Sequence, residues 1–281
     1  APDAVFDSAT GSLWESLRCD ILTFLFDEEH ADSLAATLRC VRRNAATLRD
    51  RLSIDSWRFI NQLDLADLYP GPHDQARLDD LQLLLNRLLG ILLAIAGLAN
   101  ENMTQGPVWR FFDLGRRLER AAGMLRLIER TLVRSDLALG IVLELLLEIY
   151  DSTMTYCSRY FTSLQLTPVL DLLVFDESNP RGLAFQISAI VAHVRKLRSI
   201  GNRGPEPFER EWMFDVQHSL RLVSADDLSE VGVHDARPLL AGFVASFRAR
   251  IQSLCEHVDA VYFTHAAPTR QLGAAQGSEQ S

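Results

Sequence analysis

Apolar residues recur at three- and four-residue spacing through most of the chain, and alternation of apolar and polar residues at period two is almost absent. The first pattern is typical of amphipathic helices and the second of half-buried strands. The sequence therefore predicts an all-α protein. The expected helices cover residues 12–26, 31–51, 55–63, 74–104, 107–134, 136–160, 181–200, 206–222 and 236–265.

Helix breakers lie between these segments, among them Pro70-Gly71-Pro72, Gly106-Pro107 and the stretch 201–207. Long helices joined by short turns are typical of a helical bundle. We expect a single helical domain over residues 1–265, in two halves of about 1–104 and 107–265. Residues 266–281 are small and polar, which predicts a disordered tail.

The two halves carry a trace of duplication. Shifting the chain by 149 residues places "FDEEHADSLAATL" (26–38) over "FDESNPRGLAFQI" (175–187), and seven of the 24 positions between Phe26 and Arg49 are identical. Average composition would give roughly two identities. In each copy a Phe-Asp-Glu turn precedes a helix, so we expect two pseudo-repeated halves. Chance similarity between two leucine-rich helix starts is the alternative.

The segment 111–132 carries most of the candidate chemistry. Six of its residues form an apolar seam at helical spacing, namely Leu114, Leu118, Ala121, Leu125, Ile128 and Leu132. Gly115 and Gly123 lie on a second face together with Glu119, which suggests that another helix packs there and partly buries this carboxylate. A buried carboxylate needs a partner. Arg116, three residues before Glu119, can reach it along the helix.

Two interpretations of these charges stay open. They form either an interhelical salt-bridge network or an anion pocket in which Arg116 and Arg120 face a carboxylate or phosphate and Glu119 holds them. In the second segment Asp176, Asn179 and Arg181 suit a turn and a helix N-cap, and Arg181 is a possible ligand. The candidate ligand-binding residues are Trp109, Asp113, Arg116, Glu119, Arg120 and Arg181, and Glu119 is the candidate catalytic residue.

Composition excludes some functions. The chain is 48% hydrophobic and 23% charged, with a net charge of −9, which argues against nonspecific nucleic-acid binding. Cys19, Cys40, Cys157 and Cys255 form no CxxC pair, so buried free thiols in the cytoplasm are expected. The apolar stretch around Leu88 is interrupted by Asn86 and Arg87, which favours a core helix over a membrane span.

Catalytic templates are missing from the sequence. It contains no Walker loop, GxGxxG, HExxH or GxSxG motif and no paired Glu-x-x-His units. The histidines are scattered without a nucleophile pattern. We therefore expect no metal and no cofactor, and the residues alone do not define a reaction.

Three blocks of the sequence resemble the bacterial alpha-E family, an all-helical domain with a Glu-Arg motif. The blocks are "ENMTQGPVWRFFDLGRRLERA" (101–121), "LTPVLDLLVFDESNPRGLAFQI" (166–187) and, less closely, "NAATLRDRLSIDSWRFIN" (44–61). Asn102 and Gly182 stand where the family usually has serine. The family's opening helix is not found, which matches the repeat: the counterpart of 111–121 would lie before Ala1.

The resemblance implies a partner rather than a reaction. Members of the family are fused to, or encoded beside, ATP-grasp ligases, in a peptide or amide-bond pathway. The resulting hypothesis is an interaction module that holds a carboxylate-bearing peptide or amino acid on Arg116, Arg120 and Arg181 for an ATP-grasp carboxylate–amine ligase. One alternative is an enzyme of amide formation or transfer with Glu119 as general base. The other is a structural module for homo-oligomers, with an exposed apolar stripe and no polar pocket.

Overall fold

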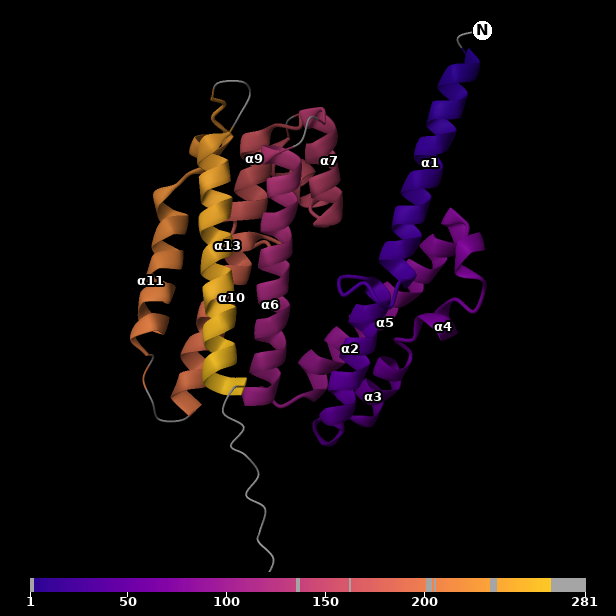
Figure 1. Ribbon diagram of the computed structural model, residues 1–281. Helices are drawn as coiled ribbons and strands as arrows, with labels where there is room; N and C mark the ends of the chain where they lie inside the picture. Colours follow the sequence, from indigo (N-terminus) through magenta and orange to yellow (C-terminus); the bar gives the residue numbers. More distant parts are fainter. Residues whose placement is uncertain are drawn as a thin grey trace, which may run out of the picture. The chain divides into compact units, whose positions relative to one another are not determined.

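The computed structural model describes residues 3–134, 137–161, 163–200, 204, 206–232 and 237–263, with side chains from residue 15 onward except at 199 and 200. The described residues are helical with no strand, as the periodicity predicted (Figure 1). The chain divides into two compact units, Ala1–Gln105 and Gly106–Ser281. The expected boundary between the halves falls at this division. The predicted tail, 266–281, lies outside the described residues.

Unit 1 is built from two long helices with short ones between them. The long helices are α1 (Asp3–Phe26) and α5 (Leu78–Asn102), and the short ones are α2 (Leu34–Thr47), α3 (Ile54–Asn61) and α4 (Leu65–Leu68). Ser33 caps α2 by accepting a hydrogen bond from the backbone N–H of Ala36, and Ser53 caps α3 in the same way. Helix α2 packs against α1 and α3, and α5 packs against α3 and α4. The core of this unit is small and leucine-rich.

Helix α5 is buried on one face only. Leu81, Leu84, Leu88 and Ile91 face the core, whereas Leu93 on the other side is 60% exposed. The prediction of a core helix was therefore half wrong, because Asn86 and Arg87 interrupt the apolar run without closing its outer face. By length and composition alone α5 could cross a membrane. In this fold 17% of its most apolar window is buried, so most of that window faces outward from unit 1. A one-sided helix of a bundle passes the same test.

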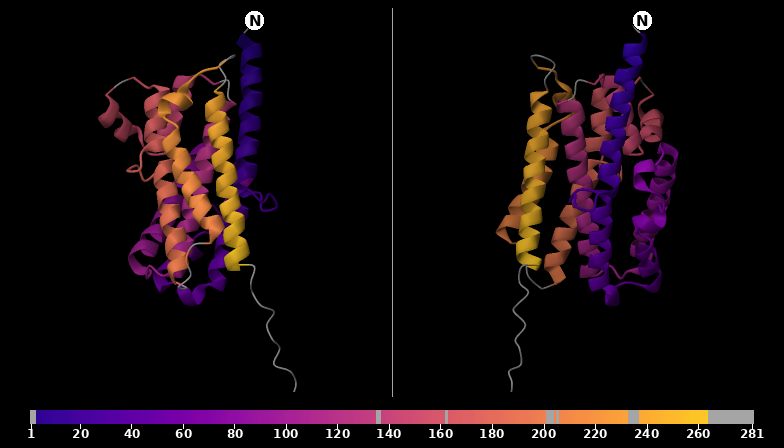
Figure 2. Two further views of the ribbon diagram at one scale, coloured as in Figure 1. Left: turned by 90° about the vertical axis from the view of Figure 1, so that its left-hand side faces the viewer. Right: turned by 45° about the vertical axis from the view of Figure 1, so that its right-hand side comes forward.

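Four helices of unit 2 run side by side (Figures 1 and 2). They are α6 (Pro107–Ile128), α10 (Leu183–Ile200), α11 (Pro207–Leu222) and α13 (Pro238–Val258). Four shorter helices complete the unit: α7 (Leu139–Ile149), α8 (Thr153–Tyr160), α9 (Leu166–Leu170) and α12 (Ala225–Ser229). One turn of π-helix extends each of α6, α9 and α13, as η3 (Glu129–Val133), η4 (Asp171–Phe175) and η6 (Asp259–Phe263).

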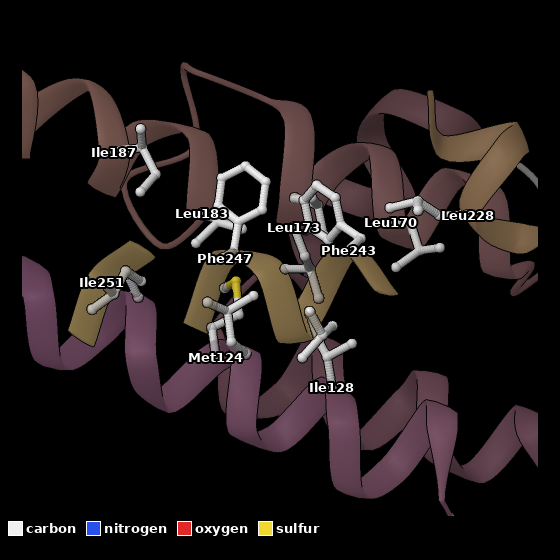
Figure 3. Packing of buried hydrophobic residues seen from close by; sticks show 14 of the residues in the cluster. Met124, Ile128, Leu170, Leu173, Leu183, Ile187, Leu228, Phe243, Phe247 and Ile251 are labelled. Carbon is white, nitrogen blue, oxygen red and sulfur yellow. The ribbon is translucent and has the colours of Figure 1, made fainter. Parts of the chain in front are cut away.

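The core of unit 2 lies along α6. Met124 and Ile128 point from α6 toward Phe243 and Phe247 of α13, with Leu173 of η4 beside them (Figure 3). The predicted seam is confirmed, because each of its members is at most 8% exposed: Leu114, Leu118, Ala121, Leu125, Ile128 and Leu132. Burying such side chains contributes about 2 kcal/mol each, so the seam fixes α6 against its neighbours.

One predicted helix was wrong. The helix expected over 136–160 is replaced by two helices within 139–160, because Asp151 adopts a left-handed backbone conformation with φ of 48°. L-residues adopt this conformation only at turns, so it ends α7 at Ile149 and lets the chain reverse into α8. The short helices α4, α9 and α12 were also missed, since four or five residues give no periodicity to recognise.

The same turn occurs in both units, at positions 149 residues apart. Asp27 Oδ1 accepts a hydrogen bond from the backbone N–H of Glu29 at 2.9 Å, and Asp176 Oδ1 accepts one from the backbone N–H of Ser178 at 2.8 Å. The following helices begin at Leu34 and Leu183, again 149 residues apart. Identical turns at a fixed offset support the duplication that the sequence suggested.

Candidate functional site

The buried carboxylate of α6 is Asp113, whose residue is 3% exposed. His193 Nε2 lies 2.8 Å from Asp113 Oδ2, and Arg117 Nε donates to the same oxygen at 3.1 Å. Arg116 Nη1 lies 3.7 Å from Asp113 Oδ1. The two arginines follow Asp113 by three and four residues, which is the helical spacing that brings side chains together. Asp113 is therefore the centre of the charged cluster.

Helix α10 supplies the other half of this cluster. Gln186 and His193 are seven residues apart, so both face α6. Gln186 Oε1 accepts a hydrogen bond from Arg117 Nη1 at 3.2 Å, and its Nε2 donates to Pro180 O at 2.7 Å. The edge of the Trp109 ring meets the ring of His193, with centroids 5.4 Å apart. Sequence analysis missed Gln186 and His193, although polar residues seven apart inside an apolar helix were a usable signal.

The environment of Asp113 keeps it ionised. Burial raises the pKa of a carboxyl, but the hydrogen bond with His193 and the charges of Arg117 and Arg116 act against burial and lower the pKa of Asp113 to about 2. A carboxylate held in this way keeps its charge at all physiological pH values. It can orient the arginines around it, but it is a poor proton acceptor.

The prediction that Glu119 is buried was wrong. Its side chain is 82% exposed, and its ion-pair partner is Arg126 at 3.8 Å rather than Arg116. A Cβ added at Gly115 or Gly123 would meet no atom of the described residues within 4 Å, so these glycines are not needed for a close helix contact there. The seam has two polar edges, and α10 covers the one that carries Asp113.

The structure brings together the remaining predicted arginines. Burial lowers the pKa of Arg120, and the positive charges of Arg116, Arg117 and Arg181 lower it further, with Asp113 opposing them. The Arg120 and Arg181 side chains form no hydrogen bond or ion pair with any residue in the described part of the chain. An excess of guanidinium groups over carboxylates can hold a carboxylate or phosphate by bidentate hydrogen bonds.

Several polar atoms of the cluster are shielded from solvent without a hydrogen bond. Trp109 Nε1 and Arg116 Nη1 are donors of this kind, and Asp113 Oδ1 and His193 Nδ1 complete the set. Buried polar atoms are normally satisfied, so a polar ligand group would gain most here. The Asp113–His193 pair has the geometry of a base and its orienting acid. Because Nδ1 of the imidazole is enclosed, the pair positions helices rather than accepting a substrate proton.

A second buried ion pair lies in unit 2. Arg198 Nε donates to Glu209 Oε1 at 2.8 Å, and His257 Nε2 lies 3.3 Å from the same oxygen. Glu209 is 1% exposed and also accepts a hydrogen bond from the backbone N–H of Glu206 in the capping box of α11. The Glu-x-x-Glu spacing before α11 was its only sequence signal. This network joins α10, α11 and α13.

Asp176 and Asn179 are turn formers, as their alternative interpretation predicted. Asp176 accepts hydrogen bonds from Ser178, and Asn179 Nδ2 donates to Leu172 O at 3.0 Å.

The cysteines were predicted to be buried and free. All four are free, but Cys255 alone is partly buried and the others are exposed, so the burial prediction was wrong. Within the described residues, no three His, Cys, Asp or Glu side chains gather to hold a metal ion.

Comparison with known proteins places this arrangement in a family. Residues 7–263 match Alpha-E, described as a predicted alpha-helical domain with a conserved ER motif. The chain belongs to the Alpha-E family. In the block that carried the resemblance, the Glu-Arg pair of this Alpha-E chain is Glu119-Arg120, on the exposed side of α6.

The similar curated proteins are uncharacterised proteins of Mycobacterium bovis and Mycobacterium tuberculosis. They are 26% identical to this chain over 265 residues, which is 89% of this chain and 30% of each relative. The Alpha-E chain thus spans about a third of the length of the curated relatives it matches. No solved structure matches it.

Proposed function

We propose that unit 2 is an anion-holding module that presents a carboxylate-bearing peptide or amino acid to an ATP-grasp carboxylate–amine ligase. The observation that carries the proposal is the concentration of positive charge at Arg120, whose pKa is lowered by burial and by the charges of Arg116, Arg117 and Arg181. Asp113, in place of Glu119, fills the holding role, because it fixes Arg116 and Arg117 from inside the bundle. The module acts in the cytoplasm in this proposal.

The ligand carboxylate would lie on Arg120 and Arg181, whose guanidinium groups have no partner within the described residues. Arg116 Nη1 and Trp109 Nε1 are shielded donors that face no acceptor at hydrogen-bond distance. A bound anion would relieve the repulsion among the guanidinium groups, so its binding energy would come from the cluster itself. The ligase as partner rests on the family resemblance, and the 30% coverage of the relatives is what a module within a larger protein produces.

Calorimetric titration of the full chain with glutarate and with inorganic phosphate tests the site. We expect saturable binding that weakens with salt and falls about tenfold or more in Arg120→Ala and Arg181→Ala. Arg126→Ala is the matched control, because Arg126 is exposed on the same helix and already pairs with Glu119. Equal binding by wild type and Arg120→Ala would contradict the site. Unchanged ligation by the ligase without this chain would contradict the partnership.

The enzyme hypothesis with Glu119 as general base gains no support from this geometry. Its side chain is 82% exposed and its ion-pair partner is Arg126, a guanidinium that stays protonated and cannot exchange protons with a base.

The oligomer hypothesis has one observation in its favour. Leu17, Ile21 and Phe24 of α1 and Leu78 and Leu85 of α5 line an apolar groove of about 760 Å³ in unit 1. The expected exposed stripe is therefore present, although unit 2 also has the polar pocket that this hypothesis did not expect. The same helix pair of a second copy would offer a self-complementary apolar face. Sedimentation of wild type against Leu85→Asp tests this, and a monomeric wild type would exclude it.

A further inference from the structure

A small cavity of about 160 Å³ in unit 2 is lined by residues of η4, α10 and α11 and of the turn after η4. Helix α10 packs against both η4 and α11. Its apolar floor is formed by Phe175, Ala184, Ile187 and Leu220. It is separate from the Asp113 cluster, because Ala184 and Ser188 lie on roughly the opposite side of α10 from Gln186.

Four polar side chains line the same cavity, namely Glu177, Ser188, Gln217 and Arg221. Gln217 and Arg221 are four residues apart on α11 and therefore share a face. Within the described residues, none of the four side chains forms a hydrogen bond or an ion pair, and Glu177 and Arg221 do not pair with each other. A carboxylate and a guanidinium thus line one cavity with their hydrogen-bonding capacity unused.

Unit 1 contains the counterpart of this cavity, in which a carboxylate and a guanidinium pair with each other. The counterpart has about 150 Å³, and five of its lining residues match the second cavity at the offset of 149: Phe26, Glu28, Ala35, Leu38 and Arg39. Arg39 Nη1 donates to Glu28 Oε2 at 2.6 Å, so the two charges satisfy each other. Serine at position 188 replaces this arginine in the second copy and leaves Glu177 without it.

We propose that the cavity lined by Glu177 and Arg221 binds a small free amino acid, with the ammonium group on Glu177 and the carboxylate on Arg221. A ligand with only a carboxylate would face repulsion from Glu177, and an amine alone would face Arg221. A zwitterion satisfies both charges, and Ser188 and Gln217 provide neutral hydrogen-bonding groups between them.

The size of the cavity limits the ligand. An apolar cavity of about 150 Å³ accommodates benzene, a molecule of about six heavy atoms. Alanine has about six heavy atoms, glycine has about one heavy atom fewer, and serine has about one more. The methyl group of alanine would lie on the apolar floor. Larger amino acids would extend out of the cavity, so selectivity for small side chains is part of the proposal. The site shares no residue with the proposed anion-holding module and can fail or succeed independently of it.

Calorimetric titration of the full chain with L-alanine, N-acetyl-L-alanine and L-alaninamide tests the proposal. A ligand of this size should bind in the micromolar to millimolar range. L-alanine should bind with a stoichiometry of one. The two blocked derivatives should bind about tenfold or more weakly, because each lacks one of the two charges.

Variants locate the site. Arg221→Ala and Glu177→Gln should each weaken L-alanine binding about tenfold or more. Arg210→Ala is the matched control, because Arg210 is exposed on the same helix and does not line the cavity. Arg39→Ala, in the unit 1 counterpart, should also leave binding unchanged. Ser188→Arg should recreate the ion pair of the first copy and abolish binding.

Circular dichroism confirms the fold of each variant, and positions 177 and 221 are exposed, so their substitutions do not disturb the core. Absence of saturable binding for alanine, glycine and serine would overturn the proposal. So would equal binding by wild type and Arg221→Ala, or alaninamide binding as tightly as alanine.

Discussion

Replacing Asp113 with asparagine removes the charge at the centre of the α6–α10 contact while keeping the size of the side chain. The folded protein lowers the pKa of Asp113 from 3.8 to about 2. At about 1.4 kcal/mol per pKa unit, the folded state favours the ionised form by about 2 kcal/mol. Removing one partner of a buried ion pair costs about 3 to 5 kcal/mol, since the other charges stay buried. We therefore expect Asp113→Asn to lower the free energy of unfolding of unit 2 by about 3 kcal/mol at pH 7.

The pH dependence identifies the cause of that loss. The folded-state pKa lies below the unfolded one, so the stabilisation by the Asp113 charge is complete above about pH 4 and is lost as the pH falls through about 2. The stability difference between wild type and Asp113→Asn should stay constant from pH 7 to about 5. It should shrink below pH 4, because Asp113 of the unfolded wild type then takes up a proton, whereas the folded state does so only near pH 2.

Urea unfolding monitored by circular dichroism at pH 7, 5, 4 and 3 measures this difference, and hydrogen exchange of α6 and α10 assigns it to unit 2. Glu119→Gln on the same helix is the control for a change of net charge. A loss below about 0.5 kcal/mol at pH 7, within the range of surface substitutions, would refute the central role of Asp113. An equally large loss at pH 3 and pH 7 would show that shape, rather than charge, is responsible.

Three other substitutions test the packing by urea unfolding. Leu125→Ala should cost about 2 to 5 kcal/mol, because Leu125 is fully buried in the seam of α6. Glu209→Gln should cost about 2 kcal/mol and raise hydrogen exchange in α11 and α13, since it leaves buried Arg198 with Glu206 as its one remaining carboxylate partner among the described residues; unchanged exchange there would contradict the role of that network. Gly182→Ala should cost about 1 to 2 kcal/mol, because an added Cβ would lie 3.2 to 3.3 Å from three backbone oxygens; a neutral result would show that the turn can relax.

The sequence predicted the helical class and the buried seam of α6 because both depend on periodicity, which is a local property. The anion site on Arg116, Arg120 and Arg181, inferred from the Arg-rich face of the helix and the family resemblance, stays a prediction. The helix prediction failed at Asp151, because aspartate tolerates a left-handed conformation without requiring one, so no local signal distinguished one long helix from two.

The sequence analysis chose Glu119 instead of Asp113 as the buried carboxylate for a different reason. Asp113 precedes Leu114 and Glu119 follows Leu118, so the two acids lie on opposite edges of the same apolar seam. A helical wheel treats these edges alike. The choice between them depends on where α10 packs, and α10 lies about 70 residues further along the chain. His193 and Gln186 were missed for the same reason, since their role exists only once α10 lies beside α6.

The two copies of the duplicated unit differ in how the charges of this cavity are used. In the first copy Arg39 pairs with Glu28, and Arg42 contacts Asp64 beside it, so the charges of that cavity stabilise the fold. In the second copy the position of Arg39 holds Ser188, and the cation, Arg221, comes from α11 instead. With the cation on another helix, the carboxylate and the guanidinium line the same cavity without forming an ion pair within the described residues. The same acidic turn therefore serves structure in unit 1 and is free to meet a ligand in unit 2.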